Sequence, residues 1–330
     1  MEVVVSQEHV GKRADVFVLS HLKLDGFTTL TRSSLHKYWE DLVRVNGKDA
    51  KQSLKLKEGD RVDISKELLL ESMEKEISSS IILPQKGSLD IVFEDRYCLV
   101  VNKKAGVVVH PGSGNSENTL SNYVVWYLQN KGEYCRNIKR GGVVHRLDKG
   151  VSGLILFAKT LEAQQFFQKQ FETQKVEKLY KAKVEGKVFP AVLSELLGSK
   201  NMNLKKEIEK LEKYNFVCDA SWARVEGYIQ RSNKNRMKMF FTPLKRSYGN
   251  GKLAISYIKP LSKEELLIKI ETGRMHQIRA TLEYLGLNIL GDTLYSTKNG
   301  KGGIPEKIEL ESILLSLENP DGERMTFKLY

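Results

Sequence analysis

The sequence is poor in cysteine and has no long apolar run. Its 330 residues include three cysteines, Cys98, Cys135 and Cys218, and none of them forms a C-x-x-C pair. This pattern argues against a disulfide framework and a thiolate zinc site, and it is typical of a reducing compartment. No stretch approaches the ~18 apolar residues that a membrane-spanning helix needs, and the chain does not open on a basic segment followed by an apolar one. We therefore expect a cytoplasmic protein with no membrane partner.

The sequence also lacks the short motifs that hold nucleotide cofactors and catalytic metals. It contains no Walker loop, no G-x-G-x-x-G and no H-E-x-x-H. We therefore expect neither a cofactor nor a metal site. A metal hydrolase that uses His110, His145 and His276 with Asp148 is an alternative, although their spacing fits no familiar ligand pattern.

Positive charge is in excess. The chain has 53 Lys and Arg against 41 Asp and Glu, which gives a formal net charge of +12. Such an excess favours a polyanionic partner, with nucleic acid before an anionic membrane surface. A length of 330 residues is typical of about two domains with ample apolar core.

The first 66 residues have the pattern of a small separate domain. Apolar spacing after Gly11 predicts one helix, Thr31 can cap a second that runs to about Glu40, and Asn46-Gly47 predicts a hairpin turn. The order R-x-D-x-F, basic helix, V-x-V-N-G and E-G-D-x-V resembles the alpha-L, or S-four-like, RNA-binding domain. The resemblance implies phosphate contacts from Arg13, Arg32, Ser33, Lys37 and Lys48. The alternative is a basic helix face that is simply solvated.

A linker and a larger domain follow. Residues 67–87 are charged and contain Ser78–Ser80 and Pro84, which is typical of a linker. Residues 88–330 contain many alternating segments with few helices between them, so we expect an α+β fold with a mixed, largely antiparallel sheet. Within the charged stretch 189–222, Leu204, Ile208 and Leu211 share one face of a predicted helix.

The stretch Gly142–Thr160 carries the most distinctive pattern, GVVHRLDKGVSGLILFAKT. Two apolar runs flank a polar turn, so they hold the charged cluster at a strand end. The neighbouring Arg146 and Lys149 favour the ionised form of Asp148. A short HRLD segment by itself would equally suit a solvated surface turn.

This stretch resembles the signature of the RluA-type pseudouridine synthases. Two further motifs occur in the order that the family has, K-x-Y-x-A-x-V-x-G from Lys178 and E-T-G-R-x-H-Q-I-R ending at Arg279. The resemblance implies that Asp148 is the catalytic aspartate, Tyr180 the active-site tyrosine and Arg279 the ion-pair partner of Asp148. Gly150 and Val151 depart from the family, which usually has an acidic or polar residue and then a threonine there.

The resemblance also implies a set of RNA contacts and a substrate. Residues matching family motifs beside the nucleophile and in a basic arm are expected to contact RNA: Arg146, Lys149, Arg231, Arg236, Lys238 and Arg274. The loop HPGSGN from His110 resembles the RluD-like branch, which favours large-subunit ribosomal RNA. Transfer RNA is an alternative substrate, and a catalytically silent RNA-binding ribosome-assembly factor is an alternative function. One chain contains the whole motif set, so we expect a monomer.

The chemistry of the family sets requirements on these residues. A carboxylate must act in a site that is closed to water, and we expect Arg279 to hold Asp148 by a two-pronged contact. Tyr180 is expected to stack on the extruded base. Its ordinary pKa of about 10 would have to fall before it could act as a base.

Overall fold

The computed structural model describes residues 1–27, 30–72, 82–112, 114–135, 137–185, 204–213, 216, 218–219, 221–244, 251–296 and 305–330. The chain divides into two compact units, residues 1–81 and 82–330. This division falls inside the stretch for which we expected a linker. Residues 66–72 are helical, and Leu69 is fully buried in the core of the first unit.

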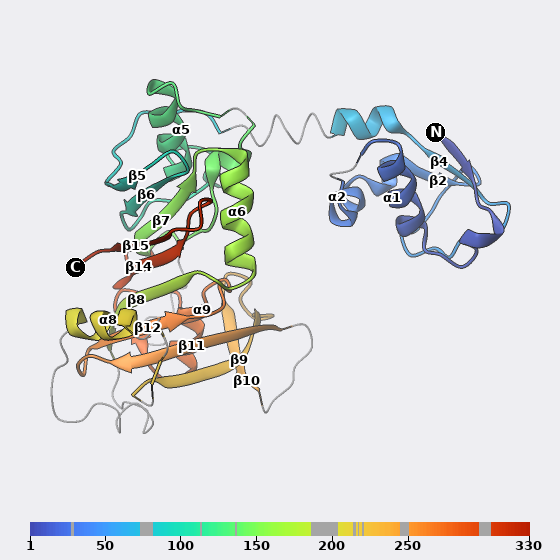
Figure 1. The fold of residues 1–330 in the computed structure, drawn as a ribbon. Helices are drawn as coiled ribbons and strands as arrows, with labels where there is room; N and C mark the ends of the chain where they lie inside the picture. The colour runs from blue at the N-terminus through green and yellow to red at the C-terminus, as the bar shows by residue number, and fades with distance from the viewer. Residues whose placement is uncertain are drawn as a thin grey trace. The chain divides into compact units, whose positions relative to one another are not determined.

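The first unit contains a four-stranded sheet and three α-helices among its named elements (Figure 1). The sheet order is β1 (Glu2–Val4), β4 (Arg61–Ile64), β2 (Val43–Val45) and β3 (Lys48–Asp49), and the helices are α1 (Ala14–Leu24), α2 (Arg32–Lys37) and α3 (Trp39–Leu42). Asn46 and Gly47 both have positive φ, as the predicted hairpin turn requires.

The second predicted helix begins where expected but ends early. The Thr31 hydroxyl accepts a hydrogen bond from the Ser34 amide at 3.2 Å, which caps α2. The prediction that this helix continues to about Glu40 is wrong, because α2 ends at Lys37 and the chain turns into the short α3. The turn places the indole of Trp39, 2% exposed, in the core of this unit.

The second unit is built on an eleven-stranded sheet of mixed direction. Nine strands form the path β10-β9-β11-β12-β8-β14-β7-β6-β5, with β13 added on β8 and β15 on β14. The β14–β7 pair is parallel and the other named pairs are antiparallel. The expected α+β fold with a largely antiparallel sheet is therefore confirmed. The strands are β5 (Ile91–Glu94), β6 (Cys98–Lys103), β7 (Ser152–Ala158), β8 (Glu177–Glu185), β9 (Ala223–Arg231), β10 (Met239–Pro243), β11 (Lys252–Pro260), β12 (Glu265–Ile270), β13 (Asn288–Ile289), β14 (Leu310–Glu318) and β15 (Arg324–Lys328).

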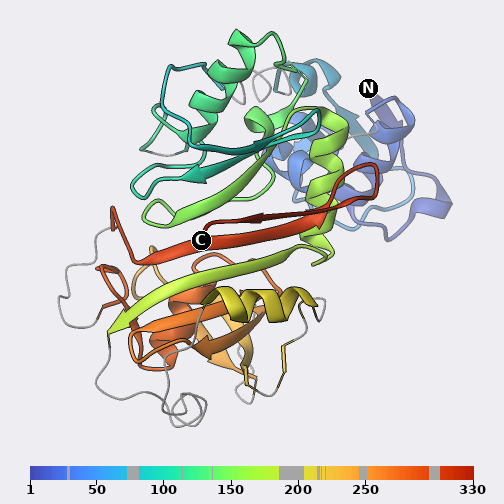
Figure 2. The same ribbon diagram turned by 60° about the vertical axis from the view of Figure 1, so that its left-hand side comes forward.

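The C-terminal strands lie in the middle of this sheet. Figures 1 and 2 show β14 between β7 and β8, where it joins the β5–β7 half to the half that contains β8 and β12. The helices of the unit are α5 (Leu120–Asn130), α6 (Leu161–Glu172), α8 (Leu204–Lys213) and α9 (Gln277–Tyr284). Among the described residues, no helix has the length and the apolar character needed to cross a membrane.

The alternation of side chains along β8 decides which face carries the site. Leu179 points to one face and packs in a cluster with Ile208 and Leu211 of α8. Tyr180 points to the other face and packs in a cluster with Ile278 of α9. Ile208 and Leu211 therefore share one face of α8, as predicted, while the side chain of Leu204 lies outside the described part of the chain.

Candidate active site

Asp148 lies in the loop that leads into β7. The buried side chains of Leu147 and Val151 fix this loop in the core on either side of it. The Val151 amide donates to the Asp148 carbonyl at 3.1 Å, which closes the turn. At Gly150 a Cβ atom would come within 2.8 Å of the Pro305 carbonyl oxygen, so this chain has no room for the larger residue that the family usually has there. The Asp148 side chain is 23% exposed.

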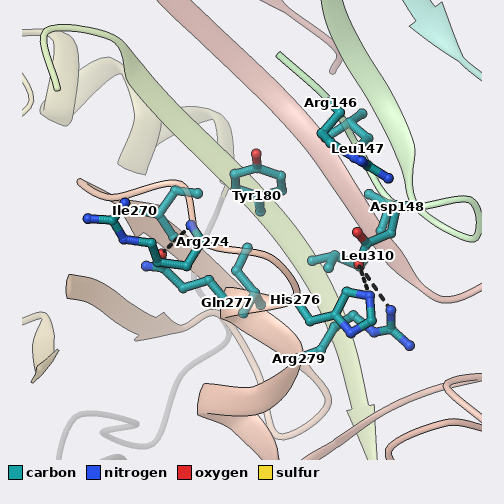
Figure 3. A pocket seen from close by; sticks show the side chains of 12 residues that line it. Arg146, Leu147, Asp148, Tyr180, Ile270, Arg274, His276, Gln277, Arg279 and Leu310 are labelled. Carbon is teal, nitrogen blue, oxygen red and sulfur yellow. Dashed lines mark hydrogen bonds and ion pairs between the residues drawn. The ribbon is translucent and has the colours of Figure 1, made fainter. Parts of the chain in front are cut away.

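Arg279 joins Asp148 to a second, buried carboxylate. Its Nη1 donates to Asp148 Oδ2 at 3.0 Å, so the structure brings together the pair that the motifs predict (Figure 3). The two-pronged contact that we expected on Asp148 is instead made to Asp292, at 2.7 Å from Nε and 2.8 Å from Nη2. The expectation of a bidentate Asp148 contact was therefore wrong, because one edge of the guanidinium is already occupied by Asp292.

Two carboxylates keep the buried Arg279 guanidinium charged against the effect of burial. The side chains of Arg279 and Asp292 are 3% and 1% exposed. Burial on its own lowers the pKa of Arg279, but the two carboxylates offset this and raise the pKa above its ordinary value. The arrangement of one cation and two anions leaves one uncompensated negative charge, at the end that faces the cavity.

His276 approaches the same carboxylate oxygen. Its Nε2 lies 3.6 Å from Asp148 Oδ2, and its Nδ1 lies 3.0 Å from the Tyr295 hydroxyl. The residue precedes α9 with a left-handed φ of 52°, a conformation that costs energy for a histidine. Burial lowers the pKa of His276 below its ordinary value, so the ring is neutral at pH 7.

Tyr180 faces the site from β8. Its side chain is 7% exposed and lines the space next to Asp148 (Figure 3). Burial raises the pKa of its hydroxyl above the ordinary value. The ring therefore suits stacking on a base better than it suits accepting a proton.

Asp148 and Tyr180 open onto a cavity of about 460 Å³. Its other lining residues include three cations, Arg146, Lys178 and Arg274, and one further acid, the exposed Glu172. An adjoining cavity of about 470 Å³ shares the stretch Gly273, Arg274 and Met275 and continues to Arg231 and Lys252. The two cavities give a basic track next to the carboxylate, as a phosphate backbone requires.

The structure divides the expected RNA contacts of this unit into two groups. Arg146, Arg274 and Arg231 line the two cavities. Lys149 and Lys238 instead form ion pairs with Glu306 at 3.6 Å and Glu283 at 3.0 Å, while Arg236 is exposed and lines neither cavity.

Several residues of the site had no role in the isomerase that the sequence predicts. Asp292, His276 and Lys178 all fall inside family motifs, in the segments I-L-G-D, G-R-x-H-Q-I-R and K-x-Y. A buried arginine costs free energy unless acidic groups pair with it, so a second acid near Arg279 was to be expected. Lys252 likewise lies in a segment that matches relatives, G-K-L-A from Gly251.

The three histidines of the hydrolase alternative do not converge. His145 stacks on Phe171 and its Nε2 accepts the Leu156 amide at 3.0 Å, while His110 Nδ1 lies 2.7 Å from the Pro111 carbonyl. The part of the chain that the structure describes holds no group of three or more His, Cys, Asp or Glu residues that suits a metal ion.

In the first unit, two of the expected RNA contacts share a buried acid. Arg13 and Arg32 donate to the fully buried Asp15 at 3.0 Å and 2.7 Å, and His36 Nε2 lies 2.9 Å from the same oxygen. Burial on its own raises the pKa of Asp15, but these three hydrogen bonds hold it well below its ordinary range. Both arginines are still more than 40% exposed, and Ser33, Lys37 and Lys48 are exposed too.

Comparison with known proteins gives one consistent result. Residues 97–284 match a family described as RNA pseudouridylate synthase. The ribosomal large subunit pseudouridine synthase D of Zymomonas mobilis is 35% identical over 216 residues, which cover 64% of this chain and 57% of that protein. An uncharacterized RNA pseudouridine synthase of Chlorobaculum parvum is 32% identical over 84% of this chain and 76% of its own length. The solved structure of human RNA pseudouridylate synthase domain containing 1 has the same fold, with a TM-score of 0.51, 20% identity, and coverage of 74% of this chain and 86% of that one.

Proposed function

Because the chain belongs to the RNA pseudouridylate synthase family, we propose that it isomerises uridine to pseudouridine in RNA and that Asp148 is its nucleophile. The observation that supports this most directly is the Asp148–Arg279 ion pair at the edge of a basic cavity that Tyr180 also lines. The reaction is an isomerisation, so it consumes no oxidant, reductant or co-substrate.

The proposed reaction breaks the N1–C1′ bond of the uridine, turns the base and joins C5 to C1′. C5 then loses its proton and N1 takes up a proton, so the product is an isomer of the substrate. Asp148 supplies the charged oxygen that attacks the nucleoside or stabilises the charge that develops on it. Arg279 fixes the direction of that carboxylate through its Nη1 contact, and Asp292 in turn fixes the guanidinium. Tyr180, whose hydroxyl keeps its proton, stacks on the turned base.

We further propose large-subunit ribosomal RNA as the substrate. The support is the similarity to the Zymomonas ribosomal large subunit pseudouridine synthase D and the HPGSGN loop from His110. In this proposal the first unit adds sequence-independent affinity through Arg13, Arg32, Ser33, Lys37 and Lys48. The proposal includes a cytoplasmic location, a monomeric enzyme and a ribosome assembly intermediate as the natural form of the substrate. Transfer RNA is the second candidate substrate.

A catalytically silent assembly factor would explain the net charge of +12 equally well. It would not explain why Arg279, held by two hydrogen bonds to Asp292, also contacts Asp148 at the edge of a cavity. Buried charged groups cost free energy, so this cluster of three charged side chains supports a chemical role for Asp148.

The test is conversion of unmodified transcripts. Large-subunit ribosomal RNA and a pool of transfer RNAs are incubated with the unsubstituted protein and with Asp148→Asn, and pseudouridines are mapped by carbodiimide treatment and primer extension. We expect new stops in ribosomal RNA with the unsubstituted protein alone, and equal RNA binding by both proteins. Modification by neither protein would overturn the enzymatic proposal and favour the assembly factor, whereas stops confined to transfer RNA would change the substrate.

A further inference from the structure

One lysine is buried in the wall of the cavity without an acidic partner. Lys178 is 5% exposed and precedes Tyr180 by two residues on β8, so both side chains point to the same face of the sheet. Both line the cavity next to Asp148. Among the described residues, the ammonium group has no hydrogen bond or ion pair, and it lies over the Phe171 ring, whose centroid is 5.7 Å from Nζ.

The other buried lysines of this unit are compensated within the described structure. Lys103 donates to three carbonyl oxygens at 2.8–3.1 Å. Lys159, Lys259 and Lys269 each form an ion pair with a glutamate. Lys178 differs from them, since its side chain is buried but pairs with no acid among the described residues, and a buried charge without a partner costs free energy. Its ammonium nitrogen is not among the enclosed polar atoms that lack a partner, so it is accessible from the cavity, where a ligand can pair with it.

The surroundings of Lys178 specify the charge of that ligand. Arg146 and Arg274 line the same cavity, and Arg231 and Lys252 continue the positive surface in the adjoining one. The acids that line the first cavity are Asp148, which Arg279 already pairs, and the exposed Glu172. Arg274 Nε donates to the Leu253 carbonyl at 2.8 Å, which fixes the guanidinium in place. A fixed arginine and a buried lysine in one wall suit an anion.

We propose that Lys178 and Arg274 form a phosphodiester subsite that holds the RNA backbone next to the target nucleotide. The rise of a β-strand puts the Cα atoms of Lys178 and Tyr180 about 7 Å apart. One nucleotide can span this separation between its base and its phosphate. A base stacked on Tyr180 and a phosphate on Lys178 would leave the ribose facing Asp148. This inference rests on the proposed function, and it adds the group that fixes the position of the ribose.

The charge state of Lys178 agrees with this role. Burial lowers its pKa to about 8, with Arg274 and Lys269 acting in the same direction and Glu177 in the opposite one. The side chain is therefore mainly protonated at pH 7, and a bound phosphate would stabilise that form.

The experiment measures RNA binding with catalysis switched off. Full-length protein that carries Asp148→Asn is titrated with an unmodified transcript of large-subunit ribosomal RNA at several salt concentrations. Lys178→Met removes the charge and Lys178→Arg keeps it. Arg274→Met removes the second cation, and Lys175→Met is the matched control, because Lys175 is exposed three residues away in the same segment.

We expect Lys178→Met and Arg274→Met each to raise Kd about tenfold and to reduce the slope of log Kd against log salt by about 0.7, the value for one phosphate contact on a single strand. Lys178→Arg and Lys175→Met should stay within about threefold of the parent in Kd. Without RNA, Lys178→Met should melt at a higher temperature than its parent, because an apolar side chain replaces a buried charge without a partner. A lysine that served the fold alone would lower the melting temperature when removed.

Three results would overturn the subsite. The first is that Lys178→Met and Lys175→Met have equal Kd and equal salt slope. The second is that Lys178→Arg and Lys178→Met lose equal RNA affinity, and the third is that Lys178→Met has both a lower melting temperature and a lower RNA affinity than its parent. The proposed function fails separately, when unsubstituted protein makes no pseudouridine in the same transcript.

Discussion

Removing the charge of either carboxylate that contacts Arg279 should have a different effect on the stability of the second unit. Asp148 makes one contact with the guanidinium and is 23% exposed, whereas Asp292 makes two contacts and is 1% exposed. Replacing Asp148 leaves the buried arginine with its main partner. Replacing Asp292 leaves a buried cation that must rely on a single bond to the reacting carboxylate. Asp292→Asn should therefore unfold the second unit more easily than Asp148→Asn does.

The expected sizes differ severalfold. Breaking a buried ion pair by removing one partner costs about 3–5 kcal/mol. For a folded unit of this size each kcal/mol shifts the melting temperature by about 2–4 °C, so Asp292→Asn should lower it by about 6–20 °C. A partly exposed ion pair contributes about 1 kcal/mol or less, so Asp148→Asn should stay within about 4 °C of the unsubstituted protein.

The assay is calorimetry of the full chain, with the transition of the second unit followed in each variant. Glu306→Gln is the matched control, since Glu306 forms an ion pair with Lys149 but its side chain is 85% exposed. The control should have the same melting temperature as the unsubstituted protein. The reasoning is refuted when Asp292→Asn melts within 2 °C of the control, or when Asp148→Asn is the less stable of the two.

Further predictions concern pH, the first unit and the basic arm. Burial lowers the pKa of His145 to about 3. The contribution of the neutral ring to the free energy of unfolding is therefore complete above pH 6.5 and declines by up to about 1.4 kcal/mol per pH unit below it. In His145→Asn, the free energy of unfolding measured with urea should depend less on pH between 7 and 5 than in the unsubstituted protein. Asp15→Asn should lower the urea-unfolding free energy of the first unit by about 1.5–3 kcal/mol, because a buried side chain loses its charge-assisted hydrogen bonds to two half-exposed arginines. A loss under about 0.5 kcal/mol would contradict this. Arg236→Met should weaken RNA binding more than Lys238→Met in a filter-binding titration, since Lys238 already pairs with Glu283; the reverse order would contradict it.

The sequence predicts the parts of this site that lie within contiguous motifs. The loop around Asp148 and the strand around Tyr180 are predicted by apolar runs beside polar turns. The family resemblance predicts the contact between Arg279 and Asp148, which are 131 positions apart in the sequence. Fold class follows in the same way, since alternating segments predict an antiparallel sheet.

The remaining parts depend on what surrounds each side chain in three dimensions. The break after Lys37 depends on burying Trp39, and the bidentate partner of Arg279 depends on where the loop of Asp292 lies. Alternation predicts which way Lys178 points, but the lack of an acid near it is visible only once its neighbours are placed. Such features are properties of the packed environment and leave no local pattern.

The most direct test of the central claim is single-turnover conversion of an unmodified large-subunit ribosomal RNA transcript by the unsubstituted protein and by Asp148→Asn. Pseudouridine is read by carbodiimide and primer extension, with RNA affinity measured for both proteins in the same buffer. We predict modification by the first protein, none by the second, and affinities within about threefold. Modification of the same uridines by Asp148→Asn, at a rate within tenfold of the unsubstituted protein, would contradict the role of Asp148.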